Sequence, residues 1–393
     1  MKNSLYIFLL LASFSVKAQD DIVKKIVDEA TNNSQLELLA HELLDVVGPR
    51  LTGTPQMKKA GEWALQRYAG WGIDARIHEF GEWRGWERGV THIDLIYPRV
   101  RTLSGMQLAY SPSTSQKGIT AELAVIPEVN NKEEFTAWLK TIQGKFVLSS
   151  MNQVTGRPEY NWEKFATPES FEKMKKDKIE ASRKWNANYR KMGVNRRNII
   201  KTLEEAGAAG ILSSNWAGGF GANRIFSAGT KKIPNIDLRL EDYSMLYRMV
   251  KNGAGPEIRV VSTSKDLGIV PSFNTLAEIK GVEKPEEYVI LSAHFDSWDG
   301  ATDNGTGTIV MMEAMRILKA IYPNPKRTIL VGHWGFEEGG LNGSRAFVED
   351  FPEIVDKTQA LFNQDNGTGR VVNISGQGFL NAYEYGSKWL FPV

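Results

Sequence analysis

One histidine and several carboxylates stand close together just after an apolar run in the chain. The run Tyr288–Leu291 has the length and the β-branched content of a buried strand. It is followed within twelve positions by His294, Asp296 and Asp303. Imidazole and carboxylate groups are common zinc ligands. A polar, glycine-rich loop at a strand end is where open α/β sheets place their chemistry, so this stretch predicts a metal site.

Two later apolar segments also end in acidic residues. Residues 327–334 precede Glu337 and Glu338, and residues 359–362 precede Asp365. If these segments are neighbouring strands of one parallel sheet, their carboxyl ends meet at a single edge. One glutamate of the pair could then ligate a metal, while its neighbour stays free as a general base.

The spacing of His294 and Asp296 predicts a further contact. Strand alternation places both side chains on the same side, so the Asp296 carboxylate could accept the second ring N–H of His294. Each pattern has an ordinary structural explanation, because adjacent glutamates often lie in solvated loops and Asp-Asn-Gly is usually a turn. Their shared position after predicted buried strands favours a metal hydrolase.

The elements that must position these residues alternate along the chain. The apolar segments are separated by a helical pattern at residues 308–321, which gives the order strand, helix, strand, helix, strand. This order predicts an α/β fold with a mostly parallel central sheet flanked by helices.

Composition limits the classes of function. The chain has 393 residues with 42% hydrophobic and 24% charged content, as in soluble globular proteins, and it contains no cysteine. Residues 1–18 read as a cleavable signal peptide, which predicts a secreted or periplasmic protein with no membrane association after cleavage. Loss of Lys2 and Lys17 changes the formal charge from +2 to 0, so no overall electrostatic case for nucleic acid remains.

A basic segment at residues 171–201 is the local exception. It holds eleven Lys or Arg residues against three Asp or Glu residues. The more specific interpretation is a face that binds nucleic acid or an anionic membrane. The salt dependence of that binding would test it. A solvated helix face is favoured, because the mature chain is neutral overall.

The motifs resemble those of the co-catalytic zinc exopeptidases, metallopeptidase family twenty-eight. The matching stretches are S-A-H-F-D-S-W-D, G-A-T-D-N-G-T-G, E-E-G-G-L-N-G-S and D-N-G around the predicted site. Residues 47–54 are similar to the amino-terminal signature of the family, and residues 272–275 match the lead-in to its catalytic strand. Short motifs between residues 118 and 234 look like its protease-associated insert.

The resemblance implies two Zn²⁺ ions per complete active site, held by His294, Asp303, Glu338 and Asp365. Asp303 would bridge both ions, with His294 and Asp365 on one and Glu338 on the other. Glu337 would act as the general base, and Asp296 would orient His294. His333 is expected to be a core strand residue without a metal role.

The resemblance also implies a domain organisation. After the signal peptide at 1–18, it gives an N-terminal part of the peptidase domain at 19–115, an inserted protease-associated-like domain at 116–264 and a zinc peptidase core at 265–393. The family has a further histidine ligand downstream of Asp365, and none follows here before Val393. We therefore expect the C-terminal part of the core to be missing from this chain.

The expected function is that of a secreted di-zinc exopeptidase acting on dipeptides or short peptides. The run Asp296–Asp299 favours carboxypeptidase or dipeptidase activity over aminopeptidase activity, by resemblance alone. An aminopeptidase of the same family is one alternative. A non-catalytic binding protein on the peptidase scaffold is another, because the last metal histidine is absent. A homodimer is also consistent with the resemblance.

Overall fold

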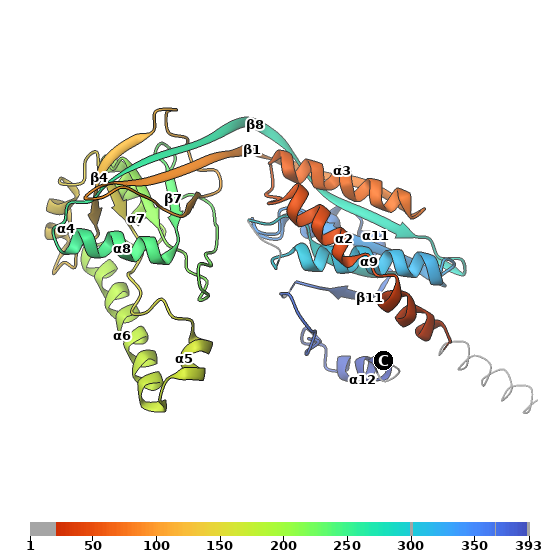
Figure 1. The fold of residues 1–393 in the computed structure, drawn as a ribbon. Coiled ribbons are helices and arrows are strands. Elements are labelled where there is room, and N and C mark those ends of the chain that lie inside the picture. The colour runs from red at the N-terminus through yellow and green to blue at the C-terminus, as the bar shows by residue number, and fades with distance from the viewer. Residues whose placement is uncertain (1–20, 299–301, 366, 391–393) are drawn as a thin grey trace, which may run out of the picture. The chain divides into compact units, whose positions relative to one another are not determined.

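The computed structural model describes residues 21–298, 302–365 and 367–390. They form two compact units: unit 1 combines residues up to Gly85 with residues from Ile269 onward, and unit 2 is Trp86–Gly268. The long strands β1 (Asp74–Tyr97) and β8 (Glu257–Ile279) contribute residues to both units (Figure 1). Among the described residues, no helix combines the length and the apolar character needed to span a membrane. The predicted signal peptide at 1–18 lies outside these residues.

The sheet of unit 1 has the strand order β11-β9-β10-β8. Strands β9 (Lys284–His294), β10 (Arg327–Trp334) and β11 (Thr358–Asn363) run parallel, whereas β8 pairs with β10 in the antiparallel direction. The prediction of an α/β fold is therefore confirmed, with a mixed sheet that is parallel at the three strands preceding the predicted site.

Helices cover both faces of this sheet. Along β10, Ile329 and Val331 pack on one face and Leu330 on the other, as strand alternation requires. The first face is covered by α2 (Leu36–Ala40), the π-helix η1 (His41–Val47), α3 (Pro55–Gly70) and α9 (Gly305–Ile321). The second face is covered by α10 (Asn342–Asp350) and α11 (Pro352–Asp356). Each fully buried Leu or Ile side chain stabilises this core by about 1.5–3 kcal/mol.

Two further helical segments belong to unit 1. Residues 21–32 are helical and precede α2, and α12 (Ala382–Leu390) follows β11 along the chain. The predicted helix at 308–321 is present and begins slightly earlier, at Gly305. It begins there because the Asn304 side chain accepts the Gly307 N–H at 2.9 Å, which satisfies one free donor of the first turn.

Unit 2 is a second α/β layer structure. Strands β4 (Ile119–Val125), β5 (Phe146–Leu148), β6 (Gly210–Ser213) and β7 (Asn235–Leu238) run parallel, and β3 (Gly105–Gln107) and β8 close the two sides in the antiparallel direction. The short β2 (Arg101–Thr102) pairs with β1. One face is covered by α8 (Leu240–Lys251), the other by α4 (Lys132–Leu139), α6 (Pro168–Met192) and α7 (Ile199–Glu205). The short helix α5 (Glu159–Phe165) precedes α6.

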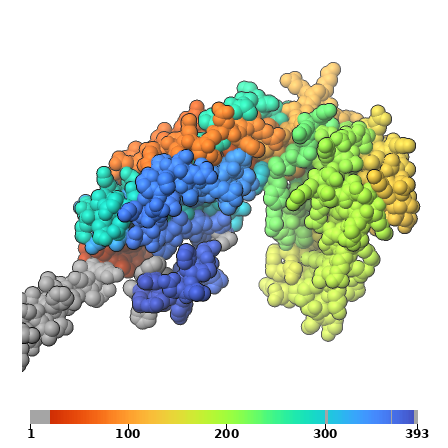
Figure 2. All heavy atoms as spheres, turned by 180° about the vertical axis from the view of Figure 1, so that it is seen from behind, coloured from red at the N-terminus to blue at the C-terminus, as the bar shows by residue number. Residues whose placement is uncertain are grey.

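The predicted insert at 116–264 lies inside unit 2, which begins earlier, at Trp86. Its identity as a protease-associated-like domain stays a prediction. The basic segment forms much of α6, on the surface of unit 2 (Figure 2). Three of its lysines pair with acidic residues of the same helix: Lys173 with Asp177, Lys175 with Glu172 and Lys184 with Glu180. This pairing favours the interpretation as a solvated helix face.

Candidate metal centre

The carboxyl ends of three parallel strands lie side by side in unit 1. His294 at the end of β9 is paired with Trp334 at the end of β10, and Ser292 of β9 is paired with Asn363 at the end of β11. The loops that leave these strands therefore start at the same edge of the sheet. That edge is where the sequence placed its predicted site.

Three of the four predicted metal ligands meet at this edge. The Nε2 atom of His294 lies 2.8 Å from Oδ1 of Asp303 and 3.0 Å from Oδ1 of Asp365. One ligand atom from each residue lies within 4.8 Å of the other two. The imidazole is buried, whereas both aspartates are exposed. One nitrogen and two carboxylate oxygens around a point are a donor set that suits zinc.

The second ring nitrogen of His294 has a different partner from the one expected. Nδ1 lies 2.9 Å from the main-chain oxygen of Asp296, and the nearer carboxylate oxygen of Asp296 is 3.8 Å away. The main-chain carbonyl, rather than the carboxylate, therefore accepts the Nδ1–H and leaves Nε2 facing Asp303 and Asp365. Such a contact fixes the tautomer in which Nε2 is the metal-binding nitrogen.

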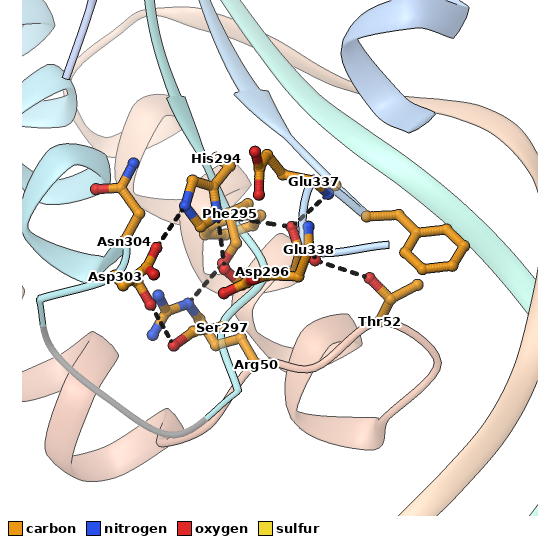
Figure 3. A network of polar contacts seen from close by, with 12 residues as sticks. Arg50, Thr52, His294, Phe295, Asp296, Ser297, Asp303, Asn304, Glu337 and Glu338 are labelled. Carbon is orange, nitrogen blue, oxygen red and sulfur yellow. Dashed lines mark hydrogen bonds and ion pairs between the residues drawn. The ribbon is translucent and has the colours of Figure 1, made fainter. Parts of the chain in front are cut away.

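The Asp296 carboxylate is buried and holds the loop after β10 instead (Figure 3). It accepts the main-chain N–H of Glu337 at 2.9 Å and that of Glu338 at 3.3 Å. These contacts tie the glutamate pair to the strand that carries His294. The alternation rule did not predict this partner, because the chain leaves the strand after His294.

The amino-terminal loop also reaches this site. Arg50 is fully buried, and its Nε donates to the main-chain oxygen of Phe295 at 2.8 Å. Thr52 Oγ1 donates to Oδ2 of Asp296 at 3.4 Å. Only the family resemblance of residues 47–54 gave a signal for this role, since no local pattern connects the loop to a site 245 positions away.

The charges around His294 determine its protonation. Burial alone would lower its pKa, but the charges of the Asp296 and Asp365 carboxylates, with the hydrogen bond to Asp365, outweigh burial and raise the pKa to about 11. Without a metal ion the imidazole is therefore protonated at neutral pH, and the proton on Nε2 lies among the carboxylates. A cation at this position satisfies the same carboxylates.

For the two glutamates near this histidine, burial acts in the other direction and raises the pKa. Burial raises the pKa of Glu338 to about 7, and the nearby Asp303 charge adds to this, while the Trp298 side chain opposes it. Burial also raises the pKa of Glu337, partly offset by His294, with further increases from the surrounding aspartates. A carboxylate with a raised pKa is a better proton acceptor, as a general base requires. Glu338 is not part of the three-residue ligand group, so its role as a metal ligand stays a prediction.

His333 lies in the core, as the sequence suggested. It is fully buried on β10, and its Nε2 lies 2.6 Å from the Tyr68 hydroxyl. Burial lowers the pKa of His333 to about 3, so the ring is neutral and shares one hydrogen bond with the Tyr68 hydroxyl through Nε2. It is not a member of the described ligand group of His294, Asp303 and Asp365.

Comparison with known proteins gives matches in sequence and in structure. Residues 274–385 match the model of Peptidase family M28. Mouse carboxypeptidase Q is 28% identical over 356 residues, which cover 89% of this chain and 69% of the mouse protein. Mouse aminopeptidase NAALADL1 is 37% identical over 131 residues, which cover 32% of this chain and 17% of that protein.

Solved structures show the same fold. An M28 peptidase precursor from Shewanella amazonensis aligns with a TM-score of 0.64 at 21% identity, covering 95% of this chain and 81% of the other. A zinc aminopeptidase from Bacillus subtilis aligns with a TM-score of 0.52 at 21% identity, covering 85% and 69%. The segment that carries the candidate site is thus the segment that matches Peptidase family M28, and the chain as a whole resembles carboxypeptidase Q of that family, which indicates a metallopeptidase.

Proposed function

We propose that this protein is a secreted, zinc-dependent metallo-exopeptidase that hydrolyses dipeptides or short peptides. The observation that carries the proposal is the position of His294 Nε2 between Asp303 and Asp365, at the edge where three parallel strands end. The donor set and the 4.8 Å grouping fit a zinc ion. The family match supports peptide substrates.

In the proposed site, His294, Asp303, Glu338 and Asp365 would hold two zinc ions. Asp303 would contribute to both, His294 and Asp365 to one, and Glu338 to the other. Bound zinc supplies Lewis acidity toward water and the scissile carbonyl. The Asp296 carbonyl holds His294 Nδ1–H, which keeps Nε2 available as a ligand.

Glu337 would perform the proton transfers. It would take a proton from the attacking water while the water oxygen bonds to the scissile carbonyl carbon. It would then give that proton to the leaving amine nitrogen as the C–N bond breaks. The raised pKa of Glu337 supports this role. The hydrogen bond from its main-chain N–H to the Asp296 carboxylate fixes the start of the loop after β10.

The test compares free and N-blocked dipeptides, each with and without a chelator. A dipeptidase or carboxypeptidase that does not need a free amino group cleaves both substrates, and chelation abolishes both activities. Cleavage that persists fully in chelator would contradict the metal mechanism. Cleavage of the free dipeptide alone would instead support an aminopeptidase, the second candidate, which the local similarity to aminopeptidase NAALADL1 favours.

A non-catalytic binding protein on the same scaffold is the third candidate. It is supported by the described ligand group, which holds three of the four predicted ligands and is a set for a single ion. Zinc stoichiometry separates it from the enzymes. Two tightly bound ions per chain support the di-zinc peptidase, whereas a chain that binds no zinc tightly supports the binding protein.

A further inference from the structure

The segment after β9 is held by the amino-terminal loop at three places (Figure 3). Arg50 Nε donates to the Phe295 carbonyl at 2.8 Å, and the Arg50 carbonyl accepts the Ser297 N–H at 3.2 Å. Thr52 Oγ1 adds a longer contact to Asp296 at 3.4 Å. Residues 295–297 are therefore fixed from outside their own strand and loop.

Ser297 passes this constraint on to a predicted metal ligand. Its side chain is fully buried, and its Oγ donates to the main-chain oxygen of Asp303 at 2.7 Å. The Asp303 side chain itself is 67% exposed. An exposed carboxylate keeps a fixed position beside His294 only if its main chain is anchored, and Ser297 provides that anchor.

Arg50 is an unusual residue to bury at this position. Its guanidinium has 0% exposure, and Nη1 and Nη2 have no hydrogen-bond partner among the residues that the structure describes. Burial lowers its pKa to about 10, against the attraction of Asp296, so it still carries its charge at neutral pH. A buried charge with unpaired donors costs free energy of folding. This cost is explained if the side chain serves the site rather than stability.

We propose that Arg50 and Ser297 are positioning residues of the metal centre. Arg50 fixes the turn at residues 295–297 from the amino-terminal loop, and Ser297 carries this constraint to Asp303. Neither residue supplies a ligand. The inference rests on the proposed function, because it assigns the two residues to the metal site of the proposed peptidase. Loss of either residue should weaken metal binding while every predicted ligand remains.

The test measures cobalt(II) binding to the full chain by competition with a chelating dye, together with the visible absorption of the bound ion. Ser297→Ala and Arg50→Met should each weaken the affinity by about 10- to 100-fold, the range known for residues that support metal ligands, and should alter the absorption bands. Arg50→Lys keeps a cation that can donate to Phe295, so it should recover part of the affinity.

Two matched controls replace buried side chains of unit 1 that make no hydrogen bond to residues 295–297 or to Asp303. Ser272→Ala removes a buried hydroxyl that has no hydrogen-bond partner among the described residues. Arg316→Lys alters a buried arginine that pairs with Glu313 and Glu29. Both controls should bind cobalt(II) as the unchanged chain does, even where thermal unfolding shows lower stability.

The outcomes separate this inference from the proposed function. If the unchanged chain binds no cobalt(II) or zinc, both fail. If it binds metal and Ser297→Ala and Arg50→Met bind with the same affinity and spectrum, the positioning role alone is overturned. If Arg316→Lys weakens the cobalt(II) affinity by the same factor, the positioning role is also overturned, because general destabilisation would then explain the loss of affinity. If Arg50→Met does not fold, Ser297→Ala decides.

Discussion

The Nε2 atom of His294 lies 2.8 Å from Oδ1 of Asp303, although His294 is buried at the end of β9 and Asp303 is exposed just before α9. With Asp365 3.0 Å from the same nitrogen, this contact defines the centre of the candidate metal site. The relationship makes His294 the residue whose replacement should have the largest effect on metal binding.

Replacement of His294 by Gln should reduce zinc affinity by more than about 100-fold, because loss of a ligand exceeds the about 10- to 100-fold cost of losing a supporting contact. Equilibrium competition with a chelator measures the change. His41→Gln is the matched control, since His41 is exposed and pairs only with Asp45 among the described residues. Wild-type affinity in His294→Gln would contradict the assignment of the site.

Replacement of Glu337 by Gln should lower kcat by about 10²- to 10⁴-fold while zinc binding is retained, because the amide cannot accept the proton of the attacking water. Steady-state hydrolysis of a dipeptide and zinc titration of the same variant provide the two measurements. Glu353→Gln, an exposed position of α11, serves as the control. A variant with unchanged kcat would remove Glu337 from the proposed mechanism.

Metal uptake at pH 7–8 should release a proton from His294. The charges of Asp296 and Asp365 overcome the effect of burial and raise the pKa of His294 to about 11, so the metal must displace the Nε2 proton. Zinc affinity should therefore rise with pH over this range. Titration calorimetry in buffers of different ionisation enthalpy measures the proton count, and a binding enthalpy independent of the buffer would rule out the displacement.

The buried His333 should make unit 1 less stable as pH falls. Burial depresses the pKa of His333 to about 3 in the folded chain, below its ordinary value of 6.5. The unfolded chain then binds more protons than the folded chain between those values, so stability is lost as pH falls through this window. This residue should contribute up to about 1.4 kcal/mol per pH unit.

His333→Gln tests this effect, because glutamine does not titrate and its carbonyl oxygen can still accept the Tyr68 hydroxyl. Urea unfolding of both proteins at several values of pH between 4 and 7 gives the difference in the free energy of unfolding. That difference should shift in favour of the variant as pH falls. A difference that stays constant with pH would mean that His333 titrates equally in both states.

The amino-acid sequence by itself determined the chemistry and its place in the fold. The strands around 288–291 and 327–334 are readable because their apolar residues favour burial, and the acidic residues that follow must therefore lie at the sheet edge. This is why His294, Asp303 and Asp365 could be grouped in advance. The mixed character of the sheet was not readable, because an apolar strand looks alike in either direction.

Only the tertiary structure decided which groups hold these residues in place. The alternation of side chains applies only within a strand. It therefore did not predict that the Asp296 carboxylate accepts the main-chain N–H groups of Glu337 and Glu338. Arg50 reaches Phe295 across 245 positions of sequence. Such contacts depend on how helices and strands pack in three dimensions, and local spacing in one sequence carries no information about that packing.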